Sequence, residues 1–204
     1  MLDVRARTAL AGPLDRAAAR LDRPAVTPGL LTALGVLAGL ASAGFAAATW
    51  WPAAAVLWLL SRLADGLDGA LARRRGTAGT GAGGFLDISA DFLVYGAFVV
   101  GVAVGVGGPA LPFLLVLLAY YVNGTVFLAF SSIAERTGRR GDDRRSGGRS
   151  LNFLGGLAEG GETIAVHTLW CLLPGSAHTI AWVWAPIVGV TAVHRVVTGY
   201  RQLR

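Results

Sequence analysis

Long apolar stretches recur along the whole chain and leave little room for a water-soluble fold. Each stretch is about 20 residues long, which is the length that a helix needs to cross roughly 30 Å of hydrocarbon. The chain is 54% hydrophobic over its 204 residues. We therefore predict an all-α, polytopic membrane protein. Its six expected transmembrane helices cover residues 29–49, 53–73, 85–106, 111–133, 154–173 and 177–197.

The first 27 residues differ from the rest, because Leu and Ala alternate there with Arg and Asp at helical spacing. This pattern predicts an amphipathic helix on the membrane surface, with Leu14, Ala18 and Leu21 on one face; a solvated tail is the alternative. Thr27 and Pro28 suit the cap and the first position of the next helix. We expect residues 1–27 to form an N-terminal amphipathic segment and residues 28–204 to form one membrane domain.

The positive charges indicate how the chain is oriented in the membrane. All 18 basic residues are Arg, and most of them lie in the N-terminal segment, around the end of the second span, between the fourth and fifth spans, and near the C-terminus. The positive-inside rule therefore predicts that both termini lie in the cytoplasm. The net charge of +6 is explained by this topology and by attraction to anionic lipids, so we do not expect a nucleic-acid partner.

Four aspartates, Asp65, Asp68, Asp87 and Asp91, lie within apolar flanks at spacings of three and four residues. Carboxylates in membrane helices are costly and are rarely without a function, and residues three or four apart share a helix face. Two such faces in contact would place four carboxylates around one point, which calls for divalent metal. A charge network with Arg62 and the arginines at 73–75, or a divalent-cation transporter, would be the alternatives. Arg62 itself either pairs with an acid or extends its charge toward water.

The aspartates belong to a longer pattern, which reads DGLDGALAR over residues 65–73 and GFLDISAD over residues 84–91, preceded by Gly83. This pattern closely resembles the signature DxxDGxxAR, a spacer, then GxxxDxxxD of the CDP-alcohol phosphotransferase family. Nine residues separate Arg73 from Gly83, where the family usually has eight. Either Arg73 or Arg74 could therefore take the role of the motif arginine. The six-span hydropathy also looks like that family, in particular like a small bacterial branch.

The resemblance implies a metal-dependent enzyme, a CDP-alcohol phosphatidyltransferase. Its metal ligands would be Asp65, Asp68, Asp87 and Asp91, and they would hold Mg²⁺ or Mn²⁺, with two ions expected. Oxygen ligands suit both metals, and a pair of ions can polarise a pyrophosphate and orient an in-line attack. Asp91 would also be the catalytic general base that removes the proton of the acceptor hydroxyl.

The nucleotide would lie along the second span, where small residues allow its close approach and an arginine suits a diphosphate. The expected nucleotide-binding residues are Asp65, Gly66, Gly69, Ala72, Arg73 and Gly83. A phosphorylated acceptor would need basic side chains, and the candidates are Arg136, Arg139, Arg140 and Arg195. Interfacial arginines with no role in binding are the alternative for this last group.

The function that the resemblance implies is transfer of a phosphatidyl group in phospholipid biosynthesis. We expect CDP-diacylglycerol as the donor, glycerol 3-phosphate or another polyol phosphate as the acceptor alcohol, and CMP as a product. A soluble CDP-alcohol donor with a lipid acceptor is the alternative arrangement. Relatives imply a homodimer in contact with membrane lipids, in the bacterial inner membrane, with the active site on the cytoplasmic side.

Overall fold

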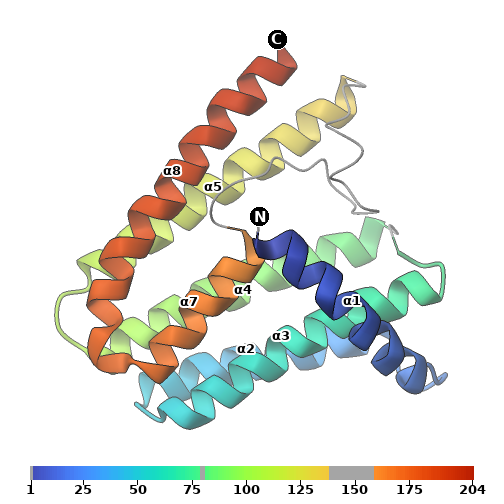
Figure 1. The fold of residues 1–204 in the computed structure, drawn as a ribbon, viewed down its shortest axis with the longest axis horizontal. Coiled ribbons are helices and arrows are strands. Elements are labelled where there is room, and N and C mark those ends of the chain that lie inside the picture. The colour runs from blue at the N-terminus through green and yellow to red at the C-terminus, as the bar shows by residue number, and fades with distance from the viewer. Residues whose placement is uncertain (1, 79–80, 138–158) are drawn as a thin grey trace. The chain divides into compact units, whose positions relative to one another are not determined.

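The computed structural model describes residues 2–78, 81–137 and 159–204, and every regular element in these ranges is a helix (Figure 1). The predicted all-α fold class is therefore confirmed. The helices are α1 (Leu2–Leu21), α2 (Pro28–Ala47), α3 (Trp51–Arg74), α4 (Gly81–Val106), α5 (Leu111–Arg136), α7 (Gly160–Leu172), the short 3₁₀ helix η1 (Pro174–Ser176) and α8 (Ala177–Leu203).

Four of the described helical segments are long and apolar enough to cross a membrane. They are Pro28–Ala47, Gly81–Val106, Leu111–Arg136 and Pro174–Leu203. The second and fifth expected spans correspond to α3 and α7. The α3 helix has 24 residues, but its C-terminal half carries several charged side chains. The described part of α7 has 13 residues. Residues 154–158 of the fifth expected span lie outside the described residues.

The helices form two compact units, and the first contains Met1–Gly108 and Gly160–Ala177. Within this unit α2 packs against both α3 and α4, and buried hydroxyl groups join α2 to α3. Ser42 donates a hydrogen bond of 2.7 Å to the carbonyl oxygen of Ala54, and Ser61 donates one of 2.7 Å to that of Gly35. These bonds satisfy hydroxyl groups whose burial would otherwise cost free energy. They also fix the position of α2 along the axis of α3.

Glycines allow α2 and α4 to approach each other at backbone distance. A Cβ added at Gly101 would collide with the carbonyl oxygen of Ala43, and one at Gly105 would collide with that of Ala46. Small residues four apart commonly permit such contacts between membrane helices. The Gly101 and Gly105 pair, one helical turn apart on α4, therefore packs helices within one chain.

Aromatic rings fill the core between α3, α4 and α7. The His167 ring on α7 stacks near Trp58, Phe98 and Trp170, with ring centroids 4.8, 5.2 and 4.8 Å away. Trp58 also stacks on Phe98 with a centroid distance of 4.7 Å, and it meets Tyr95 edge-on at 5.4 Å. Packed rings of this size leave few alternative arrangements, so the cluster holds the three helices in one register.

The N-terminal helix packs on the first unit beside the end of α3. Ala18 is fully buried in a cluster with Leu31, Ala70 and Leu71, and Leu14 lies at its edge. The expected apolar face of this helix therefore contacts protein. The predicted start of α2 is confirmed, because Thr27 is its N-cap and accepts a hydrogen bond of 3.1 Å from the backbone N–H of Leu30.

The second unit contains Pro109–Glu159 and His178–Arg204, so its described helices are α5 and α8. Side-chain hydrogen bonds join these two helices. Trp184 donates its indole N–H to the hydroxyl of Tyr120 at 2.7 Å, and Arg195 donates to the amide oxygen of Asn123 at 3.1 Å.

Candidate active site

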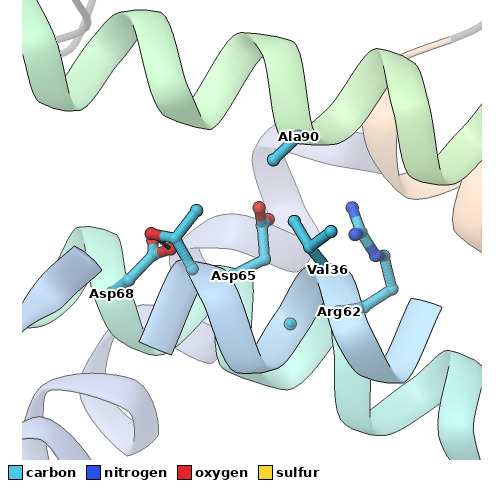
Figure 2. Close-up of a pocket in the computed structure, with 7 residues that line it drawn as sticks. Val36, Arg62, Asp65, Asp68 and Ala90 are labelled. Atoms are coloured by element: carbon cyan, nitrogen blue, oxygen red, sulfur yellow. Dashed lines mark hydrogen bonds between the residues drawn. The ribbon is translucent and has the colours of Figure 1, made fainter. Parts of the chain in front are cut away.

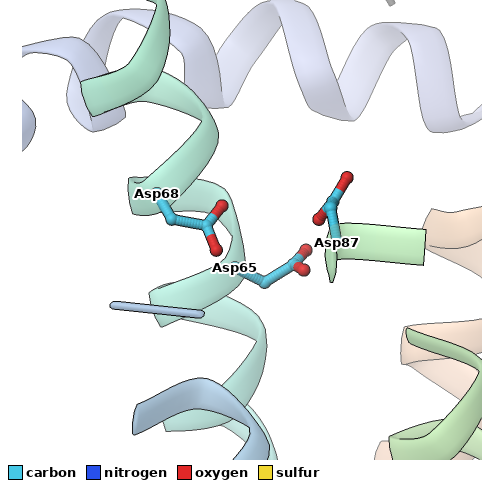
Figure 3. A group of neighbouring side chains, drawn as sticks. All are labelled: Asp65, Asp68 and Asp87. Carbon is cyan, nitrogen blue, oxygen red and sulfur yellow. The ribbon is translucent and has the colours of Figure 1, made fainter. Parts of the chain in front are cut away.

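Three of the four motif aspartates converge in the first unit. Asp65 and Asp68 come from α3 and Asp87 comes from α4, and one carboxylate oxygen from each lies within 4.8 Å of the others (Figure 3). Asp68 is buried, Asp65 is half-buried and Asp87 is exposed. Like charges at this separation repel one another strongly unless a cation lies between them. Three oxygen ligands around one point suit a hard divalent ion such as Mg²⁺ or Mn²⁺.

Thr32 of α2 supports this trio, and the sequence analysis did not identify it. Its Oγ1 lies 2.5 Å from Oδ2 of Asp68 and 3.1 Å from the carbonyl oxygen of Pro28. The hydroxyl has one proton to donate, and the shorter distance favours the charged carboxylate as its acceptor. The bond orients the carboxylate of Asp68 toward those of Asp65 and Asp87. No spacing rule connects Thr32 to Asp68, because the two residues are 36 positions apart on different helices.

Asp91 lies one helical turn beyond Asp87 on α4, and its carboxylate is bound by Arg62 of α3. The distance between Nη1 of Arg62 and Oδ1 of Asp91 is 2.6 Å. Of the two roles that the sequence left open for Arg62, the structure therefore shows pairing with an acid. The predicted roles of Asp91 as a fourth metal ligand and as a general base remain predictions.

A small pocket adjoins the trio, and helices α2, α3 and α4 all contribute to its walls (Figure 2). In the close-up, Asp65 and Asp68 extend from α3 toward α4, where Ala90 faces them. The lining residues are Thr32, Gly35, Val36, Arg62, Asp65, Asp68 and Ala90. Ala90 contributes a small side chain to the wall opposite the carboxylates.

The expected nucleotide-binding residues of α3 extend from Asp65 toward the C-terminal end of the helix. A Cβ added at Gly69 would meet only Nη1 of Arg73, at 3.4 Å, so Arg73 lies over the Gly69 surface. At Gly66, the side chain of Leu14 lies close by instead. Gly83 is exposed near the start of α4.

The three consecutive arginines at the end of α3 have different surroundings. Nε of Arg75 lies 2.8 Å from Oδ1 of Asp22, and Nε of Arg74 lies 3.4 Å from Oδ2 of the same carboxylate. Arg75 also donates to the carbonyl oxygen of Arg23 at 2.9 Å. Arg73 has no ion pair within the described ranges and remains available for a ligand. These contacts favour Arg73 over Arg74 as the motif arginine.

The candidates for an acceptor phosphate are not gathered at one described point. Arg195 is buried in the second unit, where it binds Asn123 and lies 5.4 Å from the ring centroid of Phe127. Arg136 is exposed as the last residue of α5. Arg139 and Arg140 lie outside the described residues.

Comparison with known proteins decides the family. The family model described as CDP-alcohol phosphatidyltransferase matches residues 25–194. The chain belongs to the CDP-alcohol phosphatidyltransferase family. It is accordingly a membrane transferase of phospholipid synthesis, and the matched region contains all the motif residues described above.

Two curated relatives of this phosphatidyltransferase are similar over most of their length. Inner membrane protein YnjF of Escherichia coli (strain K12) is 40% identical over 185 residues, which cover 90% of this chain and 88% of the relative. The phosphatidylinositol phosphate synthase of Mycolicibacterium smegmatis is 32% identical over 206 residues, covering 92% of this chain and 82% of the relative.

Solved structures of the phosphatidylinositol phosphate synthase of Mycobacterium tuberculosis share the fold. The structure with CDP-DAG bound gives a TM-score of 0.74 at 26% identity and covers 92% of this chain and 93% of that one. The structure in complex with manganese and citrate gives 0.73 at 27% identity, with coverages of 92% and 88%. A divalent metal is thus consistent both with a solved relative and with the aspartate trio.

Proposed function

We propose that this phosphatidyltransferase takes its phosphatidyl group from CDP-diacylglycerol, transfers it to an alcohol and releases CMP. The proposal rests on one observation, the close grouping of the Asp65, Asp68 and Asp87 carboxylates. All three residues occupy positions of the family motif. The solved relative with CDP-DAG bound supports this donor. Because the carboxylate of Asp87 is exposed, a diphosphate could approach the metal ligands from outside the helices.

The four motif aspartates, Asp65, Asp68, Asp87 and Asp91, would hold two ions of Mg²⁺ or Mn²⁺. When bound, such ions neutralise the charge of the pyrophosphate and align it for in-line displacement. Thr32 keeps Asp68 oriented toward the ligand position through its hydrogen bond. The manganese complex of the relative supports this assignment.

Asp91 would act as the general base. The acceptor hydroxyl loses its proton to this carboxylate while its oxygen forms a bond with the phosphorus of the phosphatidyl group. The bond between that phosphorus and the bridging oxygen breaks, and CMP leaves with the bridging oxygen. The side chain of Asp91 is paired with an arginine, and 39% of it is exposed. A base in this position can meet a hydroxyl group that enters from outside the trio.

The cytidine nucleotide would lie along α3, over Asp65, Gly66, Gly69 and Ala72, with Gly83 of α4 nearby. Arg73 would bind the diphosphate, because its neighbours Arg74 and Arg75 pair with Asp22. The planar guanidinium group provides several donors that match phosphate oxygens.

The acceptor would be a polyol phosphate, with glycerol 3-phosphate as the first candidate. Basic side chains at 136, 139, 140 and 195 would bind its phosphate. The phosphatidylinositol phosphate synthases among the relatives favour the wider class of phosphorylated polyols, so an inositol phosphate belongs in the same test.

We further propose six membrane spans, with α3 and the expected span that includes α7 added to the four apolar ones. The charged part of α3 would be tolerated because it faces the metal site. The N-terminal segment 1–27 would lie at the cytoplasmic surface, and residues 28–204 would form one catalytic domain. Both termini and the active site would face the cytoplasm, and the protein would function as a homodimer in a bacterial inner membrane.

The test is release of CMP by the purified protein from CDP-diacylglycerol with Mg²⁺ or Mn²⁺ and a panel of alcohols. We expect release that depends on one polyol phosphate, stops with a metal chelator and is abolished by Asp91→Asn. Asp15→Asn is the matched control, because it removes an exposed carboxylate of α1. If CMP is released only with a soluble CDP-alcohol and a lipid acceptor, the lipid is the acceptor and the proposed donor is wrong. If the Asp91→Asn variant still releases CMP, Asp91 is not the general base.

A further inference from the structure

The Arg62 guanidinium lies against two aromatic rings beside the active site. Its carbon Cζ is 5.2 Å from the ring centroid of Trp58 and 4.8 Å from that of Tyr95, and only 7% of the side chain is exposed. A buried cation is costly unless an anion compensates for it. Asp91 provides that anion, at 2.6 Å from Nη1.

The position of Arg62 is fixed from several sides. Nη2 donates to Oγ of Ser61 at 3.1 Å, and Ser61 is itself bonded to the carbonyl oxygen of Gly35. The faces of Trp58 and Tyr95 restrict the guanidinium further. These restraints hold the positive charge on the wall of the pocket that Asp65 and Asp68 also line (Figure 2).

The arginine therefore competes with any metal for the fourth carboxylate. Asp87 and Asp91 are one turn apart on α4, so their carboxylates can approach the same ion. Asp65, Asp68 and Asp87 form a close group, whereas Oδ1 of Asp91 is bound to Arg62. A divalent ion that enters the trio meets a fixed positive charge nearby, and it has to share or displace the bond to Asp91.

We propose that Arg62 is a positioning residue that acts as a built-in counter-ion, holding Asp91 out of the metal-binding trio until divalent ions compete for it. This inference rests on the proposed metal site. It assigns to Arg62 a role in setting metal affinity, separate from the roles of the aspartates. Loss of the Arg62 charge should therefore tighten metal binding even when no nucleotide or lipid is present.

The experiment titrates purified full-length protein with Mn²⁺ in the absence of substrates and follows free Mn²⁺ by electron paramagnetic resonance. We expect Arg62→Gln and Arg62→Met to bind Mn²⁺ at least about tenfold more tightly than the unaltered protein, the scale typical of groups just outside a metal's ligands. In the Met variant, an uncharged side chain occupies the space beside the rings of Trp58 and Tyr95. Thermal unfolding identifies any variant that has lost its fold, and the two neutral side chains provide independent chances of a folded protein.

Three controls separate the charge of Arg62 from other effects. Arg62→Lys keeps a positive charge in this space and should bind Mn²⁺ nearly as the unaltered protein does. Arg201→Gln removes an exposed arginine of α8 and should leave the affinity unchanged. In an Asp91→Asn background, Arg62→Gln should tighten binding by less than it does in the unaltered protein, because only the repulsion between the arginine charge and the ion is then removed.

The outcomes distinguish this inference from the metal site on which it rests. Unchanged or weaker Mn²⁺ binding in folded Arg62→Gln and Arg62→Met would overturn the counter-ion role, while the site itself would stand. The counter-ion role would also be overturned if Arg62→Gln tightened Mn²⁺ binding as much in the Asp91→Asn background as in the unaltered protein. Arg62 would then affect the trio without acting through Asp91. Absence of saturable Mn²⁺ binding by the unaltered protein would overturn both the metal site and the role of Arg62.

Discussion

Leu14 of α1 lies against Gly66 of α3, where a Cβ would stand 3.3 Å from Cδ1 and 3.4 Å from Cδ2 of the leucine. The N-terminal helix therefore covers one of the two glycines of α3 that we expect to contact the nucleotide. The other, Gly69, meets only the flexible end of Arg73. Of the two, Gly69 thus offers the surface on which a ligand can be tested without disturbing helix packing.

We predict that Gly69→Ala stabilises the protein but weakens nucleotide binding. A methyl group fits there, and replacing a mid-helix glycine by alanine should stabilise the fold by about 0.5–1 kcal/mol. The same methyl group should weaken CDP binding by about tenfold if it costs roughly 1.4 kcal/mol of close contact with the nucleotide. Thermal unfolding and CDP titration measure the two effects. Gly44→Ala, which has open space around its Cβ position, should give the stability gain alone. Unaltered CDP affinity in Gly69→Ala would remove this glycine from the nucleotide site.

The close approach of α2 and α4 makes a second prediction. Gly101→Ala should destabilise the protein by about 1–3 kcal/mol, because the new Cβ collides with the backbone carbonyl of Ala43, which cannot move aside as a side chain can. Gly96→Ala on the same helix is the matched control, since no heavy atom lies within 4 Å of its Cβ position. Unfolding temperatures in one detergent compare the two variants. Equal stability would contradict the backbone contact.

Thr32 allows a test of the metal site that changes no carboxylate. Thr32→Val keeps the shape of the side chain but removes the donor to Asp68, and it should weaken Mn²⁺ binding by about tenfold. Thr32→Ser retains the hydroxyl group and should bind Mn²⁺ as the unaltered protein does. Mn²⁺ titration without substrates measures both variants. Identical affinities in the Val and Ser variants would show that the hydrogen bond does not orient Asp68.

The arginines at the end of α3 should differ in their effect on the nucleotide. Arg73→Gln should weaken CDP binding by at least about tenfold, because loss of a charge-assisted phosphate contact costs roughly 1.5–3 kcal/mol. Arg74→Gln should change CDP affinity little, since Arg74 lies at 3.4 Å from Asp22. The reverse order would assign the motif role to Arg74. Titration with CDP and with cytidine distinguishes loss of a phosphate contact from loss of a base contact.

The sequence predicted the helical class and the limits of most helices to within a few residues. It also predicted that the four motif aspartates would meet at one point; Asp65, Asp68 and Asp87 do so, whereas Oδ1 of Asp91 is bound to Arg62. These features follow from hydrophobic length and from helix periodicity, which act locally. The pairing of Asp91 with Arg62 was left open, because spacing assigns a residue to a face but does not choose its partner. Thr32 and Asp22 were missed, since each reaches its partner across different helices through packing that a single sequence does not encode in any simple spacing.

The glycine contact between α2 and α4 has a consequence for the distant metal site. Gly101 follows Asp87 by 14 positions, or about 21 Å along a helix. A slip of α4 by one residue at this contact would rotate the helix by about 100° and shift it by about 1.5 Å, which would turn Asp87 away from Asp65 and Asp68. The backbone contact at Ala43 and Ala46 therefore sets the rotational phase of α4. Gly101, although it is remote from the trio along α4, thereby determines which aspartates can share an ion.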